Sequence, residues 1–158
     1  MKIPFQKKIL LYAYGNPGRG DDGLGNAFIE RIDQWIKEKN LQSISTDSSY
    51  QLNIEDAASI ANFDVVVFVD ASKANIDSYS FSKVQPEPQQ TFTTHSVSPS
   101  TLVLLCQELY NKLPLVYLLQ VKGFRWEFGE QLSEKALENL EKALEFAQKA
   151  IIDFQNQE

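Results

Sequence analysis

The chain has 158 residues, 43% of them hydrophobic, and we expect residues 1–158 to form a single domain around one hydrophobic core. The net charge of -6 and the pI near 4.9 argue against partners such as nucleic acids and anionic membranes, which bind basic surfaces. No apolar run reaches the length of a membrane-spanning helix, and the single cysteine cannot form an internal disulfide. We therefore expect a cytoplasmic protein.

The first half of the chain alternates strand and helix patterns. Residues 8–14 are almost continuously apolar and predict a buried strand, and residues 24–39 place apolar side chains at helical spacing. A weaker strand is expected at 43–47, followed by a short helix that starts at Asn53 as its N-cap. Residues 64–70 are rich in valine and predict a central parallel strand covered on both faces.

The second half continues this alternation. Residues 79–84 alternate aromatic residues with serine, which predicts a more exposed strand that could run antiparallel at an edge. A helix is expected from Ser98 to about residue 111, with a proline in its first turn, and a buried strand at 115–121. Ser133 is expected to cap a long helix with an apolar face formed by Leu137, Leu140, Leu144, Ala147, Ile151 and Phe154. The order predicts a three-layer α/β/α sandwich around a mostly parallel sheet of about five strands.

Polar residues that could carry out chemistry lie near the ends of three of the predicted elements. The glycine-rich run 14–27 carries Asp21 and Asp22 directly after the first strand, and Asp70 ends the third strand. His95 is the only histidine and comes just before a predicted helix. In an open α/β sheet these positions fall at one edge, outside the carboxyl ends of the strands. We expect the carboxylates and the imidazole to face one crevice.

Carboxylate and imidazole groups together suit a divalent-metal site or general acid–base chemistry. The structural alternatives are that Asp21 and Asp22 cap the following helix, that Asp70 is an ordinary residue at a strand end, and that His95 is a surface or capping residue. The glycine-rich run lacks the lysine of a phosphate-binding loop. Cys106 is expected to be a buried core thiol. The aromatic loop 123–129 could either rim the site or cover the core.

These motifs resemble the hydrogenase maturation protease family. The resemblance begins at Gly15-Asn16 and at 21–25, Asp-Asp-Gly-Leu-Gly, and continues at 67–71, where a strand ends in Asp-Ala. It includes His95, at the position of the functional histidine of the family, and the segment 127–133 before the last helix. The resemblance spans nearly the whole chain in the family's order.

The resemblance implies an aspartic-type endopeptidase that removes the C-terminal peptide of a [NiFe]-hydrogenase large-subunit precursor. It places the metal ligands and catalytic residues at Asp22, Asp70 and His95. The implied cofactor is nickel, which could be only the nickel carried by the precursor, and other divalent metals could substitute. The implied partner is the precursor, with no nucleic acid and no membrane.

One segment departs from the family pattern and leaves other functions open. Many members have Asp-Gly-Gly-Thr after the second strand, whereas this chain has Asp47-Ser48-Ser49-Tyr50. The alternative is a non-catalytic module of the same fold that binds nickel or a partner. A third hypothesis is a small-molecule hydrolase that uses Asp70 and His95 without a metal.

Overall fold

The computed structural model describes residues 6–88 and 97–157, and its centre is a five-stranded sheet of order β2-β1-β3-β5-β4. Four strands are parallel, and the edge strand β4 pairs antiparallel with β5. The strands are β1 (Ile9–Tyr14), β2 (Ile44–Ser49), β3 (Val65–Ser72), β4 (Tyr79–Lys83) and β5 (Leu115–Lys122). The expected sheet and its antiparallel edge strand are confirmed.

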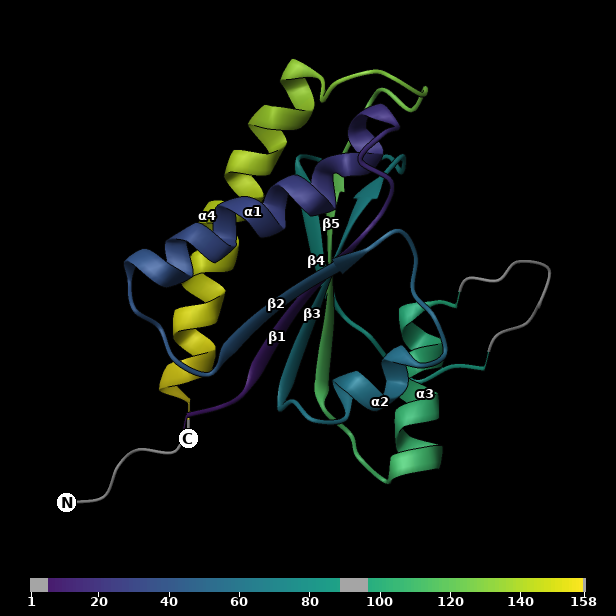
Figure 1. Ribbon diagram of the computed structural model, residues 1–158, viewed down its shortest axis with the longest axis vertical. Coiled ribbons are helices and arrows are strands. Elements are labelled where there is room, and N and C mark those ends of the chain that lie inside the picture. The colour runs from purple at the N-terminus through teal and green to yellow at the C-terminus, as the bar shows by residue number, and fades with distance from the viewer. Residues whose placement is uncertain (1–5, 89–96, 158) are drawn as a thin grey trace.

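Helices cover both faces of this sheet, which gives the expected three layers (Figure 1). One face carries α1 and α4, and the other carries α2 and α3. Their bounds are α1 (Leu24–Glu38), α2 (Asp56–Ile60), α3 (Pro99–Tyr110) and α4 (Glu134–Asn156), with a 3-10 turn η1 (Gly20–Gly23) just before α1. Among the described residues, no helix combines the length and the apolar character needed to cross a membrane.

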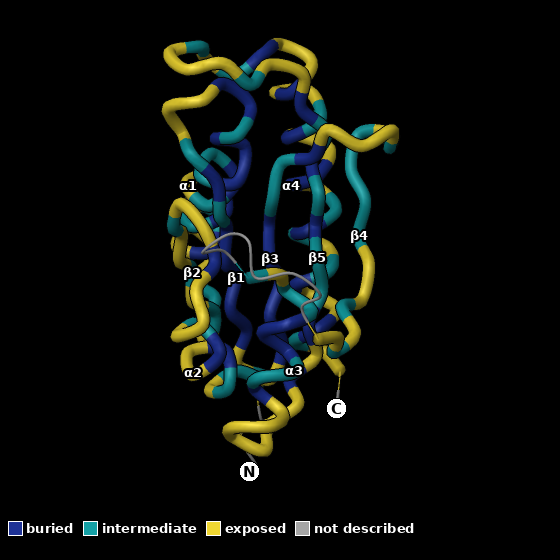
Figure 2. Tube along the Cα trace, turned by 90° about the vertical axis from the view of Figure 1, so that its right-hand side faces the viewer, coloured by how far each residue is buried: buried dark blue, intermediate teal, exposed yellow. Residues whose placement is uncertain are grey.

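The central strands are apolar on both sides because each side packs against helices. In β1, Leu11 belongs to the core under α1 and α4, whereas the neighbouring Leu10 belongs to the core under α2 and α3. In β3, Val67 and Phe68 divide in the same way. Figure 2 shows this burial along β1 and β3 and the greater exposure of the edge strands β2 and β4. Side chains alternate between the two faces of a strand, so a continuous apolar run indicates a strand that is covered on both faces.

Two predicted caps are confirmed and one is wrong. The Ser98 and Ser133 hydroxyls accept the backbone N–H groups of Thr101 and Ala136, respectively, as N-caps of α3 and α4. Asn53 does not cap α2, which begins at Asp56.

The Asp56 carboxylate instead binds the segment before the helix. It accepts the Asn53 backbone N–H at 2.8 Å and the Tyr12 hydroxyl at 3.0 Å. The side chain of Asp56 therefore ties the start of this helix to strand β1.

Three further expectations need correction. Strand β2 extends through Ser49, so Ser48 and Ser49 lie inside the strand rather than after it. Strand β5 is buried only in part: Val116, Leu119 and Val121 are buried, whereas Leu115 at its start is exposed. Leu137 is 43% exposed. It lies in the first turn of α4 and lines a surface groove of about 450 Å³ with Leu132.

The different burial of Leu137 and Leu140 predicts different effects of their substitution on stability. Leu140 is 1% exposed, so Leu140→Ala should lower the free energy of unfolding by about 2–5 kcal/mol, through lost burial and a residual cavity. Leu137→Ala is the matched control on the same helix, and its effect should be below about 1 kcal/mol. Urea denaturation of both variants tests this, and equal losses would contradict the described burial.

Candidate functional site

The first part of the site is the tight turn between β1 and η1. Gly15 has φ +142°, and a Cβ on it would lie 2.3 Å from the Asp22 carbonyl oxygen, so only glycine fits there. The turn closes on itself because the Asn16 backbone N–H donates to Asp22 Oδ2 at 2.9 Å. The Asn16 side chain in turn accepts the Gly18 N–H at 2.8 Å. These contacts fix the Asp22 carboxylate at the carboxyl end of β1.

Asp22 and Asp70 line the same cavity, as the sequence predicts. The cavity measures about 280 Å³ and is lined by Arg19, Asp22, Asp70, Ala71, Lys73 and Trp126. Asp70 reaches it from the carboxyl half of β3, and Asp22 reaches it from η1. Two carboxylates therefore meet at the edge where α/β folds place their ligands.

The two carboxylates do not share the same ionisation behaviour. Burial and the negative charge of Asp22 raise the pKa of Asp70 to about 7, although the Ala71 backbone N–H and the Tyr14 hydroxyl lower it in part. Burial, and then the charge of Asp70, raises the pKa of the Tyr14 hydroxyl well above its ordinary value. Tyr14 therefore remains protonated, and Asp70 can hold or release a proton near neutral pH.

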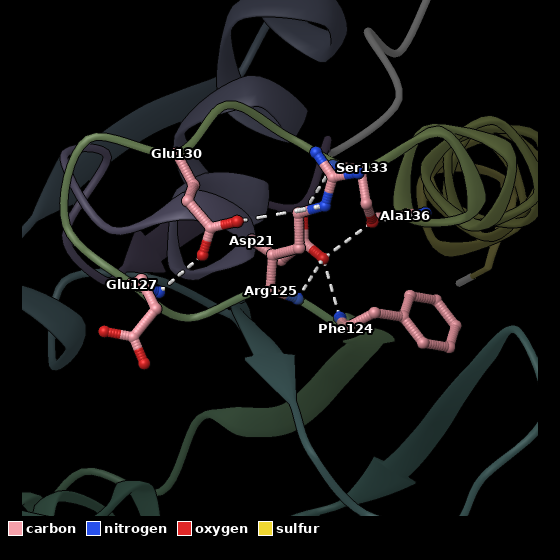
Figure 3. A network of polar contacts seen from close by, with 7 residues as sticks. All are labelled: Asp21, Phe124, Arg125, Glu127, Glu130, Ser133 and Ala136. Carbon is pink, nitrogen blue, oxygen red and sulfur yellow. Dashed lines mark hydrogen bonds and ion pairs between the residues drawn. The ribbon is translucent and has the colours of Figure 1, made fainter.

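Asp21 has a structural role, but it is not a helix cap. Its fully buried carboxylate accepts four hydrogen bonds from the loop before α4 (Figure 3). The donors are the backbone N–H groups of Phe124, Arg125 and Ser133 and the Ser133 hydroxyl, at 2.6 to 2.9 Å. Burial raises the pKa of Asp21, but these hydrogen bonds outweigh burial and hold the pKa below its ordinary value.

The contact between Asp21 and this loop also places Trp126 at the cavity. Gly123 lies so close to the turn that a Cβ on it would approach the Asp21 Cβ to 2.7 Å and the Trp126 ring to 3.0 Å. Trp126 lines the cavity beside both carboxylates. Of the two open interpretations of loop 123–129, the structure supports the one in which it rims the site.

The remaining expected site residue, His95, lies outside the described residues. Within residues 6–88 and 97–157, no three His, Cys, Asp or Glu side chains are grouped so that they could hold a metal ion. Among these residues, the expected ligand set therefore comprises the two carboxylates Asp22 and Asp70, which share one cavity.

The sequence analysis did not identify three other residues of the site. Tyr14 is the last residue of β1, which places it at the same edge as Asp70. Arg19 and Lys73 line the cavity beside the carboxylates. Each follows a strand end by a few positions, and that spacing is the signal that could have identified them. Cys106 is buried in the core, as expected.

Solved structures of hydrogenase maturation proteases share the fold of this chain. The protease HycI from Thermococcus kodakarensis KOD1 matches with a TM-score of 0.71 and 21% identity, covering 92% of this chain and 93% of that chain. The hydrogenase maturating endopeptidase HybD from E. coli matches with a TM-score of 0.70 and 19% identity, over 92% and 93% of the two chains. No protein-family model and no curated protein sequence matches the chain. The resemblance predicted from the motifs is thus confirmed in the fold.

The hydrogen bonds of Asp21 predict a large effect on stability. Asp21→Asn replaces one acceptor oxygen by an amide that faces backbone donors, and the free energy of unfolding should fall by about 3 kcal/mol. Asp22→Asn is the matched control, because Asp22 accepts one backbone N–H and repels Asp70. The free energy of unfolding of Asp22→Asn should fall by less than about 1 kcal/mol. Urea denaturation at neutral pH compares the two, and a larger loss for Asp22→Asn would contradict these roles.

The raised pKa of Asp70 predicts a specific pH dependence of stability. Between its ordinary value of 3.8 and about 7, Asp70 keeps its proton in the folded state and loses it on unfolding, so stability falls as the pH rises through this range. Asp70→Asn cannot ionise and should be more stable than wild type at pH 8, by an amount on the order of a few kcal/mol. The difference should shrink towards pH 4.

Urea denaturation in the presence of a chelator, from about pH 4 to pH 8, measures this difference. Asp22→Asn supplies the control, because removal of the neighbouring charge should weaken the pH dependence without abolishing the contribution of burial. A stability difference between Asp70→Asn and wild type that is constant across this pH range would contradict a raised pKa for Asp70.

Proposed function

We propose that this protein is an endopeptidase that removes the C-terminal peptide of a [NiFe]-hydrogenase large-subunit precursor. The observation that carries the proposal is the meeting of Asp22 and Asp70 in one cavity at the carboxyl edge of the sheet. The fold around this cavity is shared with proteins described as hydrogenase maturation proteases and endopeptidases. We place the reaction in the cytoplasm. The single cysteine is a buried free thiol, so the fold has no disulfide that would need an oxidising compartment.

A divalent cation suits the two carboxylates of the cavity, whose lining also includes the cations Arg19 and Lys73. Two carboxylates that repel each other raise the free energy of the site, and a cation between them would relieve that repulsion. We propose nickel as this ion, either bound by the protein or carried by the precursor as part of the substrate. The ligands would be Asp22, Asp70 and the histidine of the family motif, His95, and other divalent metals could substitute.

The residues at the cavity would have different roles in peptide hydrolysis. A bound ion would polarise the carbonyl group of the scissile peptide bond. Asp22 is held in place by the Asn16 N–H, so its carboxylate is positioned before any ligand arrives. The Tyr14 hydroxyl lies beside Asp70 and partly offsets the rise in the pKa of its carboxyl group. Hydrolysis adds a water molecule to the carbonyl carbon and transfers a proton to the leaving amine.

A non-catalytic module that binds nickel or a partner is the second candidate. The observation that favours it is the serine-containing segment 47–49, which is built into strand β2. Ser49 is tied by its hydroxyl to the Tyr12 hydroxyl and to the Gln51 carbonyl oxygen, each at 2.9 Å. This edge of the site therefore differs from a glycine-rich loop. Stable binding of the precursor without a cleaved product would favour this candidate.

Cleavage of a nickel-loaded precursor tests the proposed activity directly. Wild-type protein should release the C-terminal peptide, and Asp70→Ala and His95→Ala should each lower the rate at least about a hundredfold, as expected for residues of the reacting site. Asp153→Ala, an exposed position near the end of α4, is the control and should cleave at the wild-type rate. Mass spectrometry identifies the released peptide.

Two results would contradict the proposed roles. Unchanged cleavage by Asp70→Ala would remove this residue from the reaction. Full cleavage of a metal-free precursor in the presence of a chelator would remove the metal from the proposed reaction.

A further inference from the structure

A loop beside the cavity carries three aromatic rings, each with a positive charge over it. The Arg19 guanidinium lies 4.8 Å from the centre of the Phe128 ring, and the Lys73 ammonium lies 5.0 Å from the centre of the Trp126 ring. The Phe124 ring has two such neighbours, the ammonium groups of Lys122 at 5.9 Å and Lys135 at 5.8 Å. All four distances are within the range of a cation–π interaction.

These four cations, which we call the basic collar, come from separate parts of the chain. Arg19 lies in the turn after β1, Lys73 follows β3, Lys122 ends β5 and Lys135 lies in the first turn of α4. Within residues 6–88 and 97–157, none of them has a carboxylate oxygen within 4.0 Å. The ion pairs among the described residues involve other cations. One of these is Arg125 of the same loop, which pairs with Glu130.

An aromatic ring holds a cation differently from a carboxylate. The ring attracts the cation through its quadrupole and carries no net charge, so the positive charge is positioned but not neutralised. Around this loop the four cations outnumber the neighbouring acidic residues without an ion pair among the described residues, Glu127 of the loop and Glu134 in the first turn of α4. A local positive region beside a site raises the affinity for negatively charged groups of a partner.

The basic collar lies on both sides of this loop, and two of its four residues line the site cavity. Arg19, Lys73 and Trp126 line the cavity that holds Asp22 and Asp70. On the other side of the loop, Phe124 and Lys135 line a second cavity of about 490 Å³. Figure 3 shows the Phe124 ring directed away from the Asp21 network, and this ring is 43% exposed. The collar therefore extends from the cavity of Asp22 and Asp70 to the exposed side of the loop.

We propose that the basic collar binds an acidic segment of the protein substrate, adjacent to the residues that enter the cavity. This inference rests on the proposed function only in taking the partner to be a protein. A peptide can place its carboxylates at the collar and an uncharged residue beside Asp22 and Asp70. A nucleic acid carries a phosphate at every nucleotide, so the two carboxylates and the net negative charge of the chain would oppose it.

Binding of labelled peptides tests this inference without any cleavage. The probes are three fluorescein-labelled peptides of equal length, rich in glutamate, in lysine, or in serine and asparagine, and a single-stranded oligonucleotide of the same length. Fluorescence anisotropy should give an affinity for the acidic peptide at least about tenfold above that for the other probes. This affinity should fall several-fold between about 0.05 and 0.3 M salt.

Variants of the collar locate the binding surface. The triple variant Lys73→Gln, Lys122→Gln and Lys135→Gln should lose at least about tenfold in affinity for the acidic peptide. The control triple variant removes the same charge from three exposed lysines at the amino end of the sheet, Lys8, Lys39 and Lys112, and should stay within about twofold of wild type. Circular dichroism confirms that both triple variants are folded.

Several outcomes would overturn the inference. Equal affinity of the wild type for acidic and neutral peptides would do so, and so would an equal loss in the two triple variants, since net charge alone would then explain binding. An oligonucleotide that binds as tightly as the acidic peptide would replace the proposed partner by a nucleic acid. Acidic-peptide binding that fails while precursor cleavage succeeds would reject the collar and leave the proposed function intact.

Discussion

The structure of the site depends on the contact between the Asp21 carboxylate and the loop that precedes α4. Four hydrogen bonds join residues more than a hundred positions apart along the chain and make the turn after β1 and this loop one unit. Such hydrogen bonds to a buried carboxylate are strong because they replace its lost hydration. The neighbouring Asp22 and the cavity-lining Trp126 take their positions from this unit.

The pair Asp21 and Asp22 shows how environment gives two adjacent carboxylates different functions. The hydrogen bonds to Asp21 stabilise its charge and use its oxygens in holding the loop. Asp22 faces the cavity, and its charge helps to keep a proton on Asp70. One acid therefore holds the loop, and the other lines the cavity. The turn needs Gly15 because a side chain there would collide with the backbone of Asp22.

Much of the fold and part of the site could be predicted because they follow from local patterns. The apolar runs of β1 and β3 indicate strands covered twice, and parallel topology brings Asp22 and Asp70 to one edge. The role of Asp21 could not be predicted, because its hydrogen-bond donors come from a distant loop. The sequence of that loop does not indicate which carboxylate it binds. Leu137 fits the helical spacing of α4 but lies in its first turn, where a surface groove replaces the core.

The two edge strands of the sheet are also its most polar strands, and this has a consequence for the behaviour of the protein at high concentration. Strand β2 has the sequence Ile-Ser-Thr-Asp-Ser-Ser, and β4 ends in Lys83. An edge with an ionised or hydroxylated side chain is a poor template for a second chain, because addition of a strand would desolvate those groups. Both lateral borders of the sheet are thereby protected against fibril-like growth, although its interior strands are among the most aggregation-prone segments of the chain.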